Sequence, residues 1–194
     1  MWSSGSTETR NFQNGTKIAA VASAASQVSI FQVETEAQIE QARELFREYA
    51  QSLGFSLCFQ TFDKELAELP GDYTPPYGRL LLASYQNNLA GCVALHPVGG
   101  ATTDPHAIRG RRVRICEMKR LYLRQKFRGK SLGRALAERV ITEAREIGYS
   151  HMRLDTIATT MADAVVLYRR LGFYEIQPYR ENPIASVLYM ELKL

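Results

Sequence analysis

Hydrophobic positions along the chain switch between two spacings, one typical of strands and one typical of helices. Ser29–Val33 alternates as a first strand does, and Thr35 with Gln38 then forms a capping box at the start of a helix. A second, shorter helix follows Thr61–Leu66, and Pro70 comes soon after it. The apolar face of the first helix is made by Ile39, Ala42, Leu45, Phe46, Tyr49 and Leu53.

The middle of the chain is rich in β-compatible runs. Leu80–Ser84 and Leu89–Leu95 are apolar, and the polar residues Gln86–Asn88 between them predict a hairpin. Pro97–Arg111 holds glycine, proline, threonine and aspartate, which indicates a loop. Val113–Leu123 alternates again and predicts another strand.

Strand and helix alternate in the last part of the chain. Helical spacing returns after residue 131, and Gly148 is placed to end that helix. The pattern then predicts a strand over Met152–Thr156, a helix over Met161–Leu171, and closing strands over Phe173–Gln177 and Val187–Leu192. This order predicts one α/β domain over residues 29–194, a mixed β-sheet with helices on both faces.

The first 28 residues lack this periodicity. Serine, threonine, asparagine, glycine and alanine dominate residues 1–28, which predicts a disordered or flexible tail. Ile18–Ala25 is mildly apolar, but it is too short and too alanine-rich for a secretory signal. No run is long enough to cross a membrane, so we expect a cytoplasmic protein without a membrane partner.

Composition fits an ordinary soluble chain with one core. Its 194 residues are 45% hydrophobic and 23% charged, which suffices for a sizeable apolar interior. The three cysteines are widely spaced in apolar contexts, which favours buried free thiols: Cys58, Cys92 and Cys116. The 3 histidines lack the spacing of metal ligands, so no metal site is predicted.

The stretch with the clearest chemistry is the turn Arg128–Gly133, which reads Arg-Gly-Lys-Ser-Leu-Gly between a strand and a helix. Free backbone N–H groups and the positive end of the dipole make a helix start an anion site. Arg128 and Lys130 add positive charge, while Gly129 and Gly133 let the backbone approach a ligand closely. The sequence therefore predicts a pyrophosphate cradle; an ordinary solvated basic turn is the alternative.

This turn resembles motif A of the GNAT family of N-acetyltransferases, R/Q-x-x-G-x-G/A. Here the motif reads Arg128-x-x-Ser131-x-Gly133, with serine where the family usually has glycine; serine is small and caps helices well, so we expect the turn to survive. A second segment, Ala164–Phe173, is similar to the family's A-x-x-L-Y-x-x-L-G-F at the expected spacing. The resemblance covers the second half of the chain well.

The resemblance implies a GNAT-like acyl-CoA N-acyltransferase fold and an enzyme that uses acetyl-CoA. It implies cofactor contacts from the strand end, the turn and the later helix: Leu121, Tyr122, Leu123, Arg128, Gly129, Lys130, Ser131, Leu132, Gly133, Ala164, Leu167 and Tyr168. Met161 stands where many relatives have a cofactor-binding asparagine, so that contact is expected to be lost or supplied elsewhere. Thr160 and Asp163 are then the candidate caps of the later helix.

Two residues are candidates for proton transfer. In the family the tyrosine that matches Tyr168 points at the cofactor sulfur, so Tyr168 is the expected acid; a core tyrosine with a hydrogen-bonded hydroxyl is the alternative. Glu117 falls in phase with four apolar strand positions, which predicts a half-buried carboxylate with a raised pKa that accepts the amine's proton. The alternative for Glu117 is an ion pair with Arg114, Lys119 or a neighbouring strand. The apolar positions in phase are Val113, Ile115, Leu121 and Leu123.

The sequence says less about the molecule that accepts the acetyl group. In the family, the loop between the first two helices and the segment before the last strand shape the acceptor groove. Those regions hold aromatic residues and an arginine, of which we take Phe59, Tyr77 and Arg180 as substrate-binding candidates; core packing is the alternative for the aromatics. An aromatic wall with an arginine suits a small amine with a carboxylate, amino-acid-like or another metabolite, although a peptide N-terminus or lysine fits equally well.

The resulting hypothesis is an N-acetyltransferase that moves the acetyl group directly to a primary amine in a ternary complex. No cysteine or serine stands with a base, which disfavours a covalent acyl-enzyme. A non-catalytic acyl-CoA-binding domain is a second hypothesis, and a homodimer is left open. The net charge of +4 and a cluster of arginines raise nucleic-acid binding as a third, but no nucleic-acid-binding motif accompanies them, so we expect no such partner.

Overall fold

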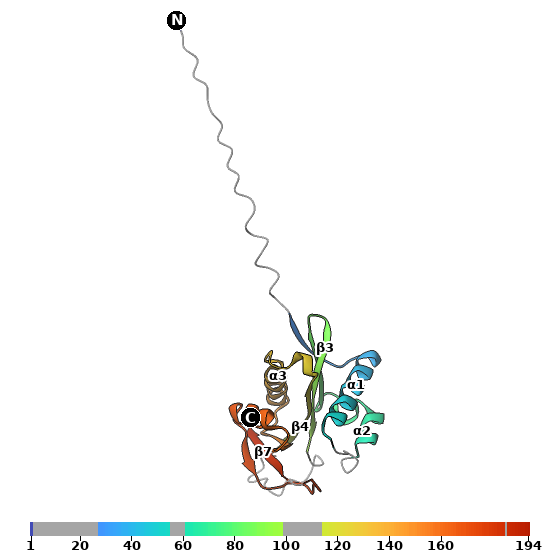
Figure 1. The fold of residues 1–194 in the computed structure, drawn as a ribbon, viewed down its shortest axis with the longest axis vertical. Helices are drawn as coiled ribbons and strands as arrows, with labels where there is room; N and C mark the ends of the chain where they lie inside the picture. The colour runs from blue at the N-terminus through green and yellow to red at the C-terminus, as the bar shows by residue number, and fades with distance from the viewer. Residues whose placement is uncertain (2–26, 55–60, 99–113, 185) are drawn as a thin grey trace.

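The computed structural model describes residue 1 and residues 27–54, 61–98, 114–184 and 186–194 (Figure 1). Most of the predicted tail over residues 1–28, the candidate Phe59, and most of the predicted loop over residues 97–111 lie outside these described residues. No described helix has the length and apolar composition needed to cross a membrane.

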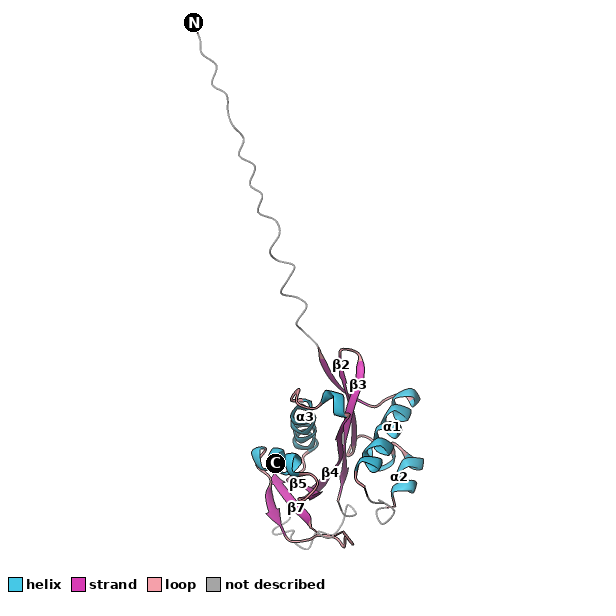
Figure 2. Ribbon diagram, viewed as in Figure 1, coloured by secondary structure: helices cyan, strands magenta, loops and turns pink. Residues whose placement is uncertain are grey.

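A seven-stranded sheet forms the centre of the fold, in the order β1-β2-β3-β4-β5-β7-β6 (Figure 2). Only β4 and β5 pair in parallel; every other neighbouring pair is antiparallel, so the predicted mixed sheet is confirmed. The strands are β1 (Val28–Gln32), β2 (Arg79–Tyr85), β3 (Asn88–Pro97), β4 (Ile115–Leu123), β5 (His151–Ile157), β6 (Tyr174–Ile176) and β7 (Val187–Lys193).

Helices cover both faces of the sheet, as predicted (Figure 1). They are α1 (Glu36–Ser52), α2 (Phe62–Glu68), α3 (Leu132–Ile147) and α4 (Ala162–Arg170). Phe46 of α1 packs in one buried cluster with Leu80 and Leu82, whereas Leu136 of α3 packs in another with Leu81. Alternate residues of β2 thus serve two cores, which explains why Leu80–Ala83 is apolar without interruption.

Local signals in the sequence placed several helix ends correctly. The Thr35 hydroxyl accepts a hydrogen bond from the Gln38 N–H at 3.3 Å, and the Gln38 side chain accepts one from the Thr35 N–H at 3.1 Å, so the capping box is confirmed. Gly148 ends α3 in a left-handed conformation with φ +90°. The prediction for α4 was wrong: its N-cap is Met161, and no side chain caps it.

The central feature for function is a split between β4 and β5. Their parallel pairing covers only three residue pairs and ends at Glu117 opposite Arg153. Beyond that point β4 continues to Leu123 without β5 at its side, so one edge of its backbone faces open space. A bulge lies in the same part of β4, where the register with β3 shifts and Arg120 adopts φ +57°.

Candidate active site

A cavity of about 750 Å³ occupies the split between β4 and β5. Its walls come from the free part of β4, the end of β5, the last turns of α1, the turn before α3, and the start of α4. Eight of the predicted cofactor-binding residues line it: Leu121, Tyr122, Leu123, Arg128, Gly133, Ala164, Leu167 and Tyr168. Segments that are far apart in the sequence therefore meet around one space.

One end of the cavity is formed by the turn before α3. Arg128 and Gly133 line this end, and the Arg128 Nε donates a hydrogen bond to the Leu123 carbonyl at 3.3 Å. The first backbone N–H groups of α3 have no partner within the helix, because an α-helix leaves its first turn unpaired. Leu132, 1% exposed, anchors the helix start in a small apolar cluster with Phe127.

The other predicted residues of the turn support this end rather than form its wall. Gly129, Lys130, Ser131 and Leu132 do not line the cavity. Gly129 has φ +76°, a conformation that glycine adopts without strain, and the Lys130 ammonium lies 5.1 Å from the centre of the Tyr85 ring. The backbone path of the turn, more than its side chains, therefore shapes this end of the cavity.

Ser131 differs from its expected behaviour. It occupies the N-cap position of α3, but its side chain makes no capping hydrogen bond, so the expectation of a hydroxyl cap is wrong. Its φ of +61° lies in the left-handed region, where a capping hydroxyl cannot reach the helix N–H groups as it does from extended backbone. The same φ explains why glycine suits this position of the motif.

Tyr168 projects from α4 into the middle of the cavity wall. It is 8% exposed, and its ring packs 5.7 Å from the ring of Phe173. Burial, with smaller effects of Tyr49 and Asp155, raises the pKa of the Tyr168 hydroxyl well above its usual value. That hydroxyl makes no hydrogen bond to any described residue, and it is not among the enclosed polar atoms without a partner, so it is open to the cavity.

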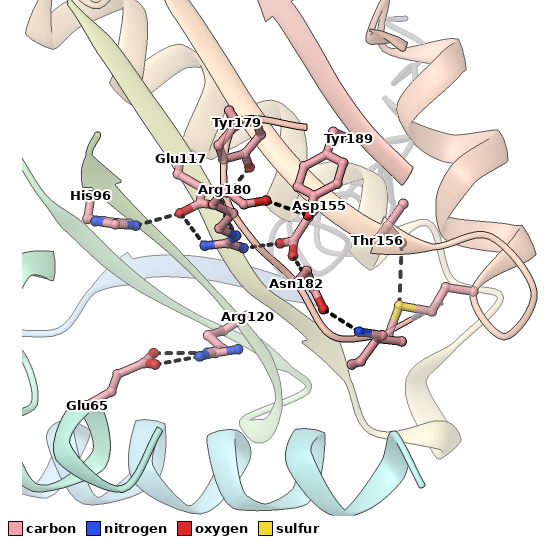
Figure 3. Close-up of polar contacts among 12 residues, drawn as sticks. Glu65, His96, Glu117, Arg120, Asp155, Thr156, Tyr179, Arg180, Asn182 and Tyr189 are labelled. Atoms are coloured by element: carbon pink, nitrogen blue, oxygen red, sulfur yellow. Dashed lines mark hydrogen bonds and ion pairs between the residues drawn. The ribbon is translucent and has the colours of Figure 1, made fainter. Parts of the chain in front are cut away.

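Glu117 lies at the fork of the split and is surrounded by donors (Figure 3). Its carboxylate accepts hydrogen bonds from the His96 Nε2 at 2.9 Å and the Tyr179 hydroxyl at 2.8 Å, and it pairs with the Arg180 Nη2 at 3.0 Å. Burial by itself raises the pKa of this carboxyl, but the His96 hydrogen bond and the charges of Lys119 and Arg180 outweigh burial and lower the pKa to about 2.

The expectation of a raised pKa for Glu117 was therefore wrong, because its partners outweigh burial. The predicted phase of Glu117 with Leu121 was also wrong, and the bulge explains that error. Met118 and Leu121 both pack in the apolar cluster beneath α3, although three positions separate them. The extra residue at Arg120 changes which positions share a face, so Glu117 is out of phase with Leu121 and faces the side of α1 and α2. An ion pair was the alternative, and its partner is Arg180 from the segment before β7.

Arg180 joins the two strands of the split. Its guanidinium pairs with Glu117 of β4 and with Asp155 of β5, and its carbonyl accepts a hydrogen bond from the Tyr189 hydroxyl at 3.1 Å. Asn182, two residues later, donates to Asp155 at 3.2 Å and lines the cavity, whereas Arg180 does not line it. These ion pairs and hydrogen bonds hold the segment before β7 at one end of the cavity (Figure 3).

Tyr77 does not reach the cavity, so its assignment to the acceptor groove is not supported. The guanidinium of Arg114 lies 4.9 Å from the centre of its ring, and the Tyr149 hydroxyl donates to its carbonyl at 2.9 Å. These partners lie at the end of α3, away from the split. The third acceptor candidate, Phe59, lies outside the described residues.

The sequence analysis did not propose all the cavity residues as site residues; two charged ones that it left out are Asp155 on β5 and Lys119 on β4. A usable signal was present, because each is a charged residue inside a predicted central strand, where charges are rare unless they have a role. What the pattern could not reveal is that the two strands separate between them.

Comparison with known proteins agrees with this arrangement. Residues 39–173 match the sequence model of the acetyltransferase (GNAT) family. An N-acetyltransferase of Schizosaccharomyces pombe is 40% identical over 170 residues, which cover 87% of this chain and 96% of the relative. One from Dictyostelium discoideum is 30% identical over 84% of this chain and 97% of its own length. A Salmonella typhimurium structure solved with its cofactor acetyl-CoA superposes with a TM-score of 0.60 over 87% of this chain and 94% of that chain, at 18% identity.

Proposed function

Because the chain belongs to the acetyltransferase (GNAT) family and is an N-acetyltransferase that uses acetyl-CoA, we propose that it transfers the acetyl group directly to the primary amine of a small, amino-acid-like molecule or another metabolite. The observation that supports this proposal is the continuous cavity, which runs from the turn before α3 past Tyr168 to the polar residues of the split.

The residues present fit acetyl-CoA. The unpaired N–H groups of α3 and the Arg128 guanidinium would hold its diphosphate, and the open edge of β4 at Leu121–Leu123 would bind the pantetheine arm by backbone hydrogen bonds. Met161 lines the cavity at the start of α4, where a thioether provides an apolar contact in place of an amide. The bound cofactor supplies the acetyl group as a thioester.

Tyr168 is proposed as the acid of the transfer. Transfer would form a bond from the amine nitrogen to the acetyl carbonyl carbon and break the bond from that carbon to sulfur, and the Tyr168 hydroxyl would give its proton to the departing thiolate. A raised pKa keeps this hydroxyl protonated over the working range of pH, which suits a donor. The proton lost by the amine passes to solvent through the open cavity, from which Tyr168 is protonated again.

Glu117 is proposed to position the acceptor end instead of taking up the amine's proton. A carboxylate with a pKa near 2 is a weak base, whereas its bonds to Tyr179 and Arg180 hold the segment before β7 over the split. By this arrangement the shape of the acceptor end depends on Glu117, although Glu117 does not touch the reacting atoms.

The surroundings of the described cysteine, serine and threonine side chains also favour direct transfer over a covalent acyl-enzyme. Cys92 and Cys116 are fully buried, burial raises their thiol pKa values well above the usual range, and neither lines the cavity. No described histidine lines the cavity either, and no described serine or threonine in its wall forms a hydrogen bond with an imidazole. An attack by the amine on the thioester needs none of these groups.

The proposal is tested by initial rates and by mass spectrometry of the intact protein. Rates measured against acetyl-CoA at several concentrations of a panel of amino acids and small amines are expected to give intersecting reciprocal plots, as a ternary complex requires. Protein mixed with acetyl-CoA alone is expected to carry no acetyl group that an amine can remove. Parallel plots together with a dischargeable acetyl-protein would contradict direct transfer.

A further inference from the structure

Among the residues that the structure describes, three cations line the cavity: Lys119, Arg120 and Arg128. Arg120 has a carboxylate partner, because its Nε donates to Glu65 at 2.9 Å. Arg128 lies at the end of the cavity beside α3, where the cofactor's diphosphate is expected. Lys119 lies on β4 at the split, within electrostatic range of Glu117 and Glu65, but it forms no ion pair with either of them.

The ammonium group of Lys119 has no hydrogen-bonding partner in the part of the chain that the structure describes. It forms no hydrogen bond and no ion pair with any residue in the described ranges, although the side chain is partly buried. Its Nζ is not among the enclosed polar atoms without a partner, so it borders open space, and the cavity is the space that Lys119 lines. Burial and the charges of Arg120 and Arg180 outweigh the opposite effect of Glu117 and Glu65, so the pKa of Lys119 is lowered. An anionic ligand would offset the cost of burying this charge.

A negative charge stands at the matching position on the other side of the split. The parallel register pairs Glu117 with Arg153, so Lys119 and Asp155 each come two residues after the last paired positions, on the same face of their strands. The strands separate at this point, and Lys119 and Asp155 form no ion pair with each other. A cation on β4 and a carboxylate on β5 therefore flank one cavity without neutralising each other.

The carboxylate of Asp155 can accept a further hydrogen bond, and Asp155 shares the cavity with Tyr168, the proposed acid. Its Oδ1 accepts from Arg180 and its Oδ2 from Asn182, which leaves lone pairs on both oxygens. Asp155 and Tyr168 line the same cavity, and the negative charge of Asp155 contributes to the raised pKa of Tyr168. An amine attracted to Asp155 would thus be close to the site of transfer.

We propose that Lys119 and Asp155 select a zwitterionic acceptor, in which the amine and a free carboxylate are separated by one or a few carbon atoms. Lys119 binds the carboxylate by a charge-assisted hydrogen bond, and Asp155 attracts the ammonium form before it loses its proton. An α-amino acid is the simplest molecule of this class. The inference rests on the proposed function, since it names the acceptor of that same site.

The test compares amino acids with their carboxamides, which keep the side chain and the amine but lack the negative charge. Wild-type protein is expected to show a kcat/KM at least about 10-fold higher for the acid than for its amide. Lys119→Met should lower kcat/KM for the acid by about 10- to 100-fold and leave the amide within about 3-fold, since a hydrogen bond to a charged group is lost only with the acid. Lys119→Arg should restore part of the preference. Lys64→Met, which changes an exposed lysine of α2, serves as the matched control.

Three results would overturn the inference: amides used as well as acids by the wild type, a preference that survives in Lys119→Met, or an equal loss for acid and amide. The last result would place Lys119 at the reacting carbonyl. Where turnover is too slow to compare, calorimetric titration of an N-acetyl amino acid and of its amide into the protein with coenzyme A gives the same contrast. Equal binding of the two, or none, would again overturn it.

The outcome also separates this inference from the proposed function. If amines without a carboxylate are acetylated while amino acids are not, acetyl transfer stands and only the zwitterion-binding role of Lys119 and Asp155 is rejected. If acetyl-CoA binds but no amine of either class is acetylated, the proposed function itself is rejected together with the inference.

Discussion

The two ends of the cavity are built in different ways. The end beside α3 comes from one continuous turn, Arg128–Gly133, where we propose that the backbone N–H groups bind the cofactor's diphosphate. The end at the split is lined by side chains from β4, β5 and the segment before β7, and Arg180 joins these segments through ion pairs with Glu117 and Asp155 (Figure 3). A site made by one turn depends on the conformation of that turn, whereas a site made by three segments depends on how they are held together.

The largest expected effect is at the end beside α3. Gly133 lines the cavity in the first helical turn, and an added Cβ would meet only the Leu123 side chain at 3.5 Å, so Gly133→Glu should fold. Its carboxylate would repel the diphosphate. At an acetyl-CoA concentration 100-fold above Kd, the wild-type Tm should rise by roughly 5–10 °C, and the variant's Tm should not change.

The control for this variant adds the same charge to the same helix. Thr142→Glu places a carboxylate on an exposed position of α3, away from the cavity, and should keep the full rise in Tm. Loss of the rise in both variants would show that the charge acts through helix stability rather than at the anion site.

The next effect is at the middle of the cavity, where the two ends meet. Tyr168→Phe removes the proposed acid and should lower kcat by about 100-fold or more, with the Kd of acetyl-CoA within about 3-fold of the wild type. Steady-state rates and calorimetry measure the two quantities. Tyr77→Phe removes a hydroxyl outside the cavity and should leave both unchanged. A normal kcat in Tyr168→Phe would assign this tyrosine to packing.

At the split, the expected effect depends on pH. The folded pKa of Glu117 is about 2, below its ordinary value of 4.5, so its stabilising contribution is complete above pH 4.5 and is lost as the pH falls toward 2. Glu117→Gln should be less stable at neutral pH and should show a shallower fall of unfolding free energy across that window. Chemical denaturation at several pH values measures the slopes.

Other carboxyls with lowered pKa values contribute to the acid slope of both proteins, so only the difference between them counts. Glu175→Gln, which breaks an exposed ion pair with Arg169, should change the unfolding free energy by less than about 1 kcal/mol and keep the wild-type slope. Identical slopes for Glu117→Gln and the wild type would contradict a lowered pKa at Glu117.

The smallest expected effect is a change in the unfolding free energy, and it concerns the turn before α3. Ser131 is held at φ +61° without a capping hydrogen bond, so Ser131→Gly should raise the unfolding free energy by about 1 kcal/mol, since glycine adopts this backbone without strain. Ser131→Ala, which removes a hydroxyl that caps nothing, should have little effect. A clear loss of stability in Ser131→Ala would show that the hydroxyl does act as a cap.

The difference between the two ends of the cavity also explains which features could be predicted from the sequence. The capping box of Thr35, the end of α3 at Gly148 and the turn before α3 each depend on residues a few positions apart, so short-range patterns are sufficient. The order of strands and helices followed from hydrophobic spacing for the same reason, and with it the mixed sheet covered on both faces.

The acceptor end could not be predicted in this way, because its geometry depends on distant segments. The bulge at Arg120 adds one residue to β4, and no hydrophobic pattern marks it, so the face assigned to Glu117 was wrong. The role of Lys119 and Asp155 depends on the register of two strands that then separate. Tyr77 was misplaced because its packing partners, Arg114 and Tyr149, come from later in the chain.

One measurement tests the division of the cavity most directly: calorimetric titration of acetyl-CoA into the wild type, Gly133→Glu and Lys119→Met. Binding should be lost in Gly133→Glu and retained within about 3-fold in Lys119→Met, because the first changes the cofactor end and the second only the acceptor end. Full binding by Gly133→Glu, or an equal loss in Lys119→Met, would contradict a cavity with two separate ends.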